Sequence, residues 1–182
     1  AGKSDQVKAS VIYFKIGDIY RKRKQWKAMA KHYKKFLKTY DKVATTGLRL
    51  QAYTLIGNAY WEQAQPSIKG RRKKWSNFDF VNKKAQRAYN TAYQLYLTLP
   101  RVAGDGPKIK RALKTPLSDD ALSAVAEARF KMGETAFLNV KFRTKLKAKN
   151  YRDVKKFTTE MKKGIKARGK MISGVRKIYQ DV

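Results

Sequence analysis

Cysteine is absent from this sequence of 182 residues, and histidine occurs only once, at His32. These absences exclude disulfide frameworks, thiolate zinc sites, cysteine nucleophiles and metal clusters held by several histidines. Long apolar runs are missing as well, so we expect no membrane-spanning helix. Because little is left for nucleophilic or metal-assisted chemistry, we expect no catalytic residue, no metal site and no cofactor.

Acidic residues are scarce. The chain has 44 lysine and arginine residues against 13 aspartate and glutamate residues, which gives a formal net charge of +31 at pH 7. A charge of this size predicts attraction to nucleic acid or another polyanion. Hydrophobic residues still make up 42% of the chain, which is enough for a folded domain rather than a disordered basic tail.

Two features that could suggest chemistry have simpler explanations. His32 stands between Lys31 and Tyr33, and we expect it to be a solvated surface side chain. Asp119 and Asp120 follow Ser118, an order typical of a helix start, where a serine caps free amides and carboxylates complement the helix dipole.

Proline occurs only four times, and apolar residues recur at helical spacing through most of the chain. The pattern predicts an all-α fold of about six helices in antiparallel pairs. We expect these helices at about 11–20, 26–40, 48–60, 85–99, 119–145 and 152–179. A long loop should separate the fourth from the fifth, with a helical turn over 108–113. In the last helix, Gly164, Gly169 and Gly174 lower helix propensity, so we expect another helix to approach closely there.

One short pattern recurs along the chain. The strings YFKIGDIY at 13–20 and YTLIGNAY at 53–60 share an aromatic residue, an Ile-Gly pair and a tyrosine at matching offsets, and FKMGETAF at 130–137 echoes them. The pattern resembles the first helix of the tetratricopeptide repeat, a pair of antiparallel helices that stacks into a solenoid. The chain departs from that family at Met29 and Asp41, and about sixteen residues are inserted in the second repeat.

The resemblance implies a degenerate, loop-expanded α-solenoid that forms one domain over 1–182, similar to those of bacterial envelope-associated repeat proteins. Its repeats would span about 5–42, 46–100 and 118–182, with a linker at about 101–117. Gly17 and Gly57 would lie where paired helices approach closely. No repeat follows the last helix, so we expect a fragment or a terminus, located in the cytoplasm or the bacterial periplasm.

The resemblance also implies a concave groove lined by the first helices of the repeats. Three of the four glutamates and Asp18 fall on those helices, whereas the second helices are rich in lysine. We expect the groove to contain Phe14, Asp18, Asn58, Trp61, Glu62, Glu127 and Glu134. It would receive a protein, or a cationic or polar peptide; alternatively, its acids only pair with neighbouring lysines across helices. Of the basic residues with which some members of the family clamp a carboxylate, only Lys131 has a counterpart here.

Three basic runs form a second candidate site. They fall in the connections within the repeats, which would share one edge of a solenoid and form a cationic rim. The residues are Arg21, Lys22, Arg23, Lys24, Lys69, Arg71, Arg72, Lys73, Lys74, Lys145, Lys147 and Lys149. Trp75 and Phe78 would be available to stack on bases. The alternative is a diffuse basic surface that binds polyanions without a defined site.

The sequence thus favours a non-catalytic interaction scaffold whose cationic outer surface binds nucleic acid or another polyanion. One alternative is a peptide- or protein-binding scaffold of a bacterial envelope assembly that uses the groove. Another is a repeat scaffold whose surface was deliberately recharged, since lysine stands where glutamate is common on most helices.

Overall fold

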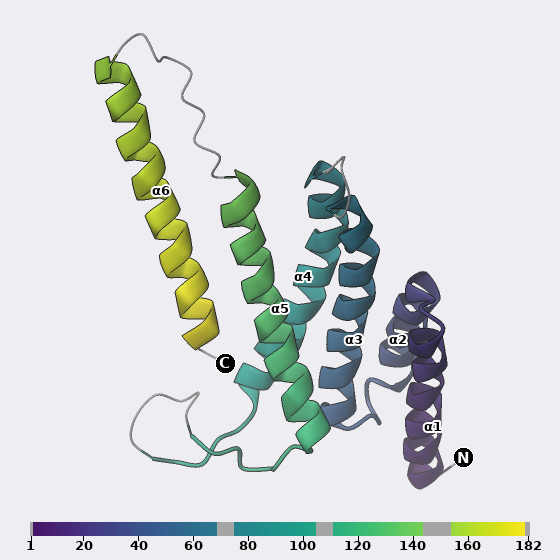
Figure 1. Ribbon diagram of the computed structural model, residues 1–182. Helices are drawn as coiled ribbons and strands as arrows, with labels where there is room; N and C mark the ends of the chain where they lie inside the picture. Colours follow the sequence, from purple (N-terminus) through teal and green to yellow (C-terminus); the bar gives the residue numbers. More distant parts are fainter. Residues whose placement is uncertain (1, 69–74, 105–110, 144–153, 181–182) are drawn as a thin grey trace. The chain divides into compact units, whose positions relative to one another are not determined.

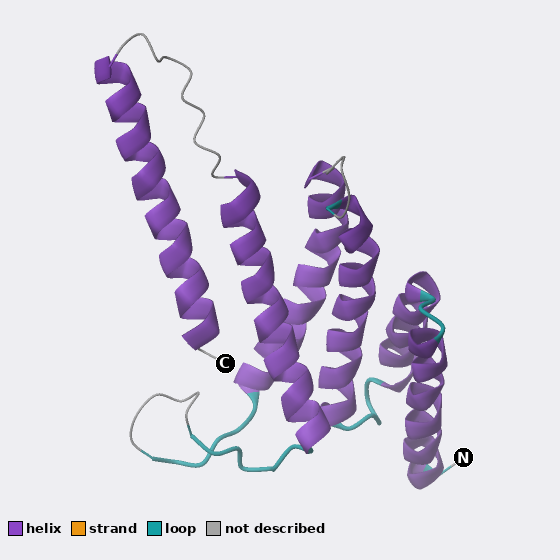
Figure 2. Ribbon diagram, viewed as in Figure 1, coloured by secondary structure: helices purple, strands orange, loops and turns teal. Residues whose placement is uncertain are grey.

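The computed structural model describes residues 2–68, 75–104, 111–143 and 154–180. Within these ranges the chain forms six α-helices and one turn of 3-10 helix, and no strand (Figures 1 and 2). The helices are α1 (Lys3–Lys22), α2 (Trp26–Tyr40), α3 (Thr46–Ala64), α4 (Trp75–Thr98), α5 (Asp119–Arg143) and α6 (Val154–Gln180), and Gln65–Ser67 is the 3-10 turn. The predicted all-α fold is confirmed.

Contacts divide the chain into two compact units, Ala1–Ala128 and Arg129–Val182. The boundary falls inside α5, so the first unit contains α1 to α4 and the beginning of α5. The second unit contains the rest of α5 and α6.

In the first unit, α1 and α2 pack antiparallel through aromatic side chains. The ring centroid of Phe14 lies 5.1 Å from that of Tyr33 and 5.3 Å from that of Phe36. Both α2 rings are fully buried. The α2 sequence explains this packing, because its apolar residues recur every three or four positions while its five lysines occupy the opposite, exposed face.

The turn between α1 and α2 depends on one residue in the left-handed region, Lys24, whose φ is 56°. This conformation lets the amide of Gln25 donate to the carbonyl oxygen of Tyr20 at 2.9 Å, which satisfies an otherwise free group at the end of α1. The turn therefore stops α1 at Lys22 and allows α2 to fold back.

Helix α3 is the central helix of the first unit. It buries residues on several faces, many of them small, including Ala52, Thr54, Gly57 and Ala59. It packs on α2 on one side and on α4 on another (Figure 1). Small residues let neighbouring backbones approach closely, so the composition of α3 suits a helix surrounded by others.

Gly17 and Gly57 mark two close helix contacts of the unit. A Cβ atom at Gly17 would lie 2.5 Å from the hydroxyl oxygen of Tyr33, and one at Gly57 would lie 2.9 Å from Cζ of Tyr89. Since real Cβ atoms essentially never come closer than 3.0 Å, a larger residue at either position would require the tyrosine ring to shift. The close approach predicted for both glycines is confirmed.

The linker between α4 and α5 differs from its prediction. Arg101 and Leu113 form an isolated antiparallel bridge, in which the amide of Val102 donates to the carbonyl oxygen of Ala112 at 2.9 Å. The part of the expected helical turn that the structure describes, 111–113, is therefore not helical. The Arg101 guanidinium holds it in place by donating to the carbonyl oxygen of Arg111 at 2.8 Å.

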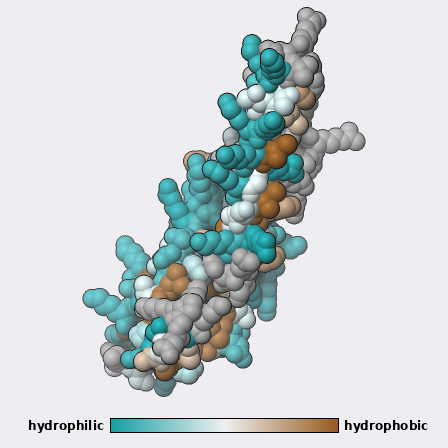
Figure 3. Space-filling view, turned by 90° about the vertical axis from the view of Figure 1, so that its left-hand side faces the viewer, coloured by the Kyte–Doolittle hydropathy of each residue, from teal (hydrophilic) through white to brown (hydrophobic). Residues whose placement is uncertain are grey.

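In the second unit, α5 and α6 line a cavity of about 390 Å³, with Val140 and Val175 buried nearby. The expectation of a close helix contact along α6 is wrong at Gly169 and Gly174, because no atom of the described residues lies within 4 Å of a Cβ atom added at either. Side chains such as Ile165 and Ile172 remain more than half exposed. Small apolar patches accordingly lie among hydrophilic residues on the surface (Figure 3). No helix within the described ranges is long and apolar enough to span a membrane.

Candidate binding groove

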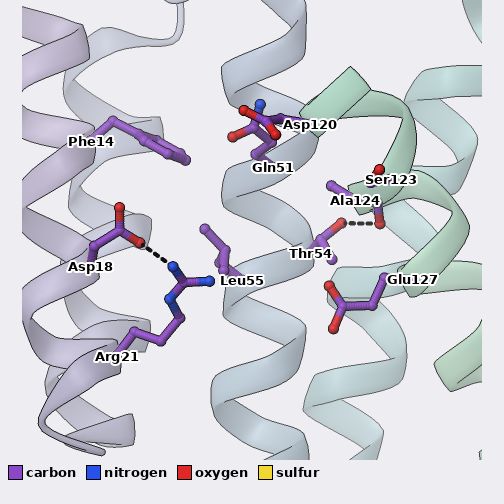
Figure 4. Close-up of a pocket in the computed structure, with 10 residues that line it drawn as sticks. All are labelled: Phe14, Asp18, Arg21, Gln51, Thr54, Leu55, Asp120, Ser123, Ala124 and Glu127. Carbon is purple, nitrogen blue, oxygen red and sulfur yellow. Dashed lines mark hydrogen bonds and ion pairs between the residues drawn. The ribbon is translucent and has the colours of Figure 1, made fainter. Parts of the chain in front are cut away.

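A groove with a cavity of about 290 Å³ lies within the first unit, between α1, α3 and the beginning of α5 (Figure 4). Each helix contributes one wall or the floor. The lining residues are Phe14, Asp18 and Arg21 from α1, Gln51, Thr54 and Leu55 from α3, and Asp120, Ser123, Ala124 and Glu127 from α5. Carboxylate, hydroxyl, amide and apolar groups therefore face one space.

The α1 wall combines an apolar ring with an ion pair. Phe14 is 7% exposed and belongs to the aromatic core described above. One turn further, Asp18 Oδ1 lies 3.1 Å from a guanidinium nitrogen of Arg21. The two side chains are 37% and 54% exposed, so water screens this pair and it contributes little to stability.

The α5 wall is fixed to α3 by two hydrogen bonds. The hydroxyl of Thr54 donates to the carbonyl oxygen of Ala124 at 3.0 Å, and the side-chain amide of Asn58 donates to Oε1 of Glu127, also at 3.0 Å. Residue numbers rise in the same direction along both helices, from Thr54 to Asn58 and from Ala124 to Glu127, so α5 runs parallel to α3. Ser118 caps α5, as predicted, and places Asp120 in its first turn at the mouth of the groove.

Three carboxylates and one guanidinium face the groove, which makes its lining acidic in a chain of net charge +31. Behind the α1 wall, burial raises the pKa of Tyr33, the nearby Asp18 carboxylate raises it further, and Arg21 partly offsets the rise. The Tyr33 hydroxyl is consequently protonated at neutral pH and available as a hydrogen-bond donor.

The structure gathers some of the predicted groove residues and separates others. Phe14, Asp18 and Glu127 line the cavity, and Asn58 stands beside it through its bond to Glu127. Trp61 does not line the groove: it is 5% exposed, because its ring packs edge-on against Phe78 in the core.

Two predicted glutamates also lie outside the groove lining. Glu62 is half-buried on α3. Glu134 belongs to the second unit, where it accepts a hydrogen bond from Lys131 at 2.6 Å. Glu134 thus pairs with a lysine of its own helix, which does not test pairing across helices, whereas Asp120 and Glu127 face the cavity.

The rim of basic residues falls mostly outside the described residues. This applies to Lys69, Arg71, Arg72, Lys73, Lys74, Lys145, Lys147 and Lys149. Arg21, Lys22, Arg23 and Lys24 are described and exposed at the end of α1, where Arg21 turns toward the groove.

The prediction that Phe78 stacks on bases is wrong, because the side chain is fully buried against Trp61. The side chain of Trp75 is not among the parts of the chain that the structure describes.

His32 is not the solvated side chain that was expected. Its ring stacks on Tyr13 with centroids 4.4 Å apart, and Nε2 donates to the carbonyl oxygen of Tyr13 at 2.8 Å. The half-buried imidazole therefore joins α2 to α1. Within the described ranges, no group of three or more histidine or carboxylate side chains is placed to hold a metal ion.

Seven lining residues were not predicted for the groove: Arg21, which was assigned to the rim, and Gln51, Thr54, Leu55, Asp120, Ser123 and Ala124. Gln51 carried a usable signal, since it stands six residues before Gly57, as Glu127 stands six residues before Gly133 of the recurring pattern. Comparisons of this chain with protein-family models, with curated proteins and with solved structures each find no match.

Proposed function

We propose that the chain is a non-catalytic interaction scaffold of the tetratricopeptide type, and that the groove between α1, α3 and α5 binds an extended peptide segment. The observation that carries the proposal is the mixed lining of the groove, in which Phe14 and Leu55 offer apolar contact beside carboxylate, hydroxyl and amide groups. Ligand sites commonly combine apolar contact with a few placed polar groups in this way.

The repeated glycine-tyrosine contact supports the repeat assignment. Tyr33 follows Gly17 by 16 residues, and Tyr89 follows Gly57 by 32, which agrees with the insertion of about sixteen residues in the second repeat. The parallel course of α3 and α5 also agrees with stacked repeats, whose first helices follow one another on the same face. In such an array the groove is the surface shared by the first helices.

A phage-displayed library of random twelve-residue peptides tests the proposal. The Ser123→Tyr variant places a bulky ring in the groove from an exposed position of α5, whereas Ala126→Tyr adds the same ring at an exposed position outside the groove. Peptides enriched on the unmodified chain should retain binding to Ala126→Tyr and lose most of it with Ser123→Tyr. Equal binding to both variants would refute a peptide site in the groove.

Polyanion binding on α2 is a second candidate function, and a separate observation supports it. Lys27, Lys31, Lys34, Lys35 and Lys38 are all exposed, and no acidic residue occurs within Trp26–Tyr40. Such a face is suited to contacts with a phosphate backbone, which are strongly salt-dependent.

Fluorescence polarisation of a single-stranded oligonucleotide, measured across a salt series, tests this second function. Replacing Lys31, Lys34, Lys35 and Lys38 by glutamine should weaken binding and flatten its salt dependence. The matched variant neutralises Arg71, Arg72, Lys73 and Lys74 of the expected rim. A larger loss with the rim variant would refute α2 as the binding face and favour the rim.

A further inference from the structure

Tyr33 and Tyr89 occupy matching places but differ in their hydrogen bonding. Tyr89 packs on Gly57, and its hydroxyl donates to Oδ1 of Asn58 at 2.8 Å. The side-chain amide of Asn58 in turn donates a hydrogen bond to Glu127. Tyr33 packs on Gly17 in the same way and is fully buried, yet its hydroxyl has no hydrogen-bond partner among the residues that the structure describes. A buried donor of this kind costs free energy unless an acceptor reaches it.

Asp18 stands where the second repeat has Asn58, since each follows its glycine directly. By this correspondence we infer that the Tyr33 hydroxyl lies on the Asp18 side of the α1 wall, behind the groove, as the Tyr89 hydroxyl lies against Asn58. An amide can accept from tyrosine with its oxygen and donate onward with its nitrogen, whereas a carboxylate only accepts. Asp18 can therefore accept donors with both of its oxygens, and in this structure Oδ1 pairs with the water-exposed guanidinium of Arg21 (Figure 4).

The other lining residues of the groove indicate which kind of hydrogen-bond donor would bind to Asp18. Asp120 and Glu127 add two further carboxylates, whereas Phe14 and Leu55 provide apolar surface beside Asp18. A lysine or arginine side chain matches both features, because it combines an apolar stem with a cationic, donor-only head.

We propose, on the basis of the peptide-binding role above, that the groove selects peptides carrying a lysine or arginine side chain, which displaces Arg21 from Asp18. In the bound state one oxygen of Asp18 accepts from the cation of the peptide and the other accepts from the hydroxyl of Tyr33. The acidic lining then has a counter-charge, and the buried tyrosine gains an acceptor.

The variant that tests this selection is Asp18→Asn. Its amide can accept from Tyr33 as Asn58 accepts from Tyr89, so the fold is preserved while the charge is removed. Asp41→Asn is the matched control, because Asp41 is an exposed carboxylate paired with Arg49 outside the groove. All three proteins are used to select from the library of twelve-residue peptides at about 0.5 M salt, where screening limits the effect of net charge to a few ångströms.

The proposal predicts a lysine or arginine at one fixed place in peptides enriched by the unmodified chain and by Asp41→Asn, but not in those enriched by Asp18→Asn. Replacing that cation by norleucine should weaken binding about five-fold with the unmodified chain and leave binding to Asp18→Asn nearly unchanged. Peptides that Ser123→Tyr blocks but that show no fixed cation would overturn the inference and leave the proposed function intact. The absence of any peptide blocked by Ser123→Tyr would overturn both.

Discussion

Replacing Gly57 by alanine tests the packing that places α3 against α4. The added Cβ atom would lie 2.9 Å from Cζ of Tyr89 and closer still to two other ring atoms. The ring is fully buried and its hydroxyl is bonded to Asn58, so it cannot move aside freely. Overpacking of this kind costs about 1–3 kcal/mol, and displacement of the hydroxyl adds the loss of a hydrogen bond, about 1 kcal/mol.

The gain in helix propensity from glycine to alanine, about 1 kcal/mol, opposes these costs only in part. We therefore expect Gly57→Ala to lower the free energy of unfolding by about 1–3 kcal/mol. Urea unfolding followed by tryptophan fluorescence measures it, because all three tryptophans belong to the first unit, which contains residues up to Ala128.

Gly169→Ala is the matched control on α6, where nothing lies within 4 Å of the added Cβ. There the propensity gain is unopposed, so circular dichroism should show stabilisation of about 1 kcal/mol. In a background in which Tyr89 is leucine, Gly57→Ala should lose most of its cost, since the clashing ring atoms are absent. Unfolding of Gly57→Ala at the same urea concentration as the unmodified chain would refute the packing argument.

The remaining predictions concern the two tyrosines and the end of α1. Tyr33→Phe removes an unpartnered buried hydroxyl and should leave stability unchanged or raise it by about 1 kcal/mol, whereas Tyr89→Phe should lower it by about 1 kcal/mol; equal urea midpoints would contradict this difference. Because the pKa of Tyr33 is raised by folding, its protonated form stabilises the fold below the ordinary tyrosine pKa, and that contribution declines as pH rises above about 10. Tyr33→Phe should therefore reduce the alkaline loss of stability seen in urea titrations. Lys24→Gly should stabilise the first unit by about 1 kcal/mol, because glycine adopts a φ of 56° without strain; thermal melting would show a higher midpoint. Arg21→Gln should strengthen binding of a lysine-containing peptide by freeing Asp18, and Lys22→Gln, which removes the same charge outside the groove, should do so much less in a fluorescence titration.

Local patterns in the sequence predicted six helices and the two glycine contacts, although α1 and α4 begin eight and ten residues before their expected starts. The Ile-Gly pair recurs at a fixed offset from a tyrosine on one helix face, so Gly17 and Gly57 could be identified without knowing which rings they meet. Ser118 was identified as a cap for the same reason, since capping depends on residues within one turn.

Predictions that depended on which residues surround a side chain in the folded chain were less successful. His32 is flanked by lysine and tyrosine in sequence, which hides the fact that its ring faces Tyr13, 19 residues away. Phe78 follows a basic run and looked exposed, but Trp61 of the preceding helix covers it. Gly169 shows the converse error, because a glycine within a helix does not by itself require a neighbour.

The groove was only partly predictable because its far wall comes from a distant part of the chain. Thr54 and Ala124, which join α3 to α5, are 70 residues apart in the sequence. Periodicity within a helix indicates which face is apolar but not which helix covers it. The recurring pattern was informative at Glu127 and could have been at Gln51, whereas Asp120 was explained by its helix start alone.

Methyl resonances provide the most direct test of the groove as a peptide site. Leu55 and Ala124 line it from α3 and α5, whereas Ala28 lies on α2 outside it. Titration of the methyl-labelled chain with a lysine-containing peptide enriched from the library should shift the Leu55 and Ala124 signals to saturation and leave Ala28 unchanged. The same titration of Ser123→Tyr should shift none of them. Saturable binding that moves Ala28 and leaves Leu55 and Ala124 in place would contradict the account.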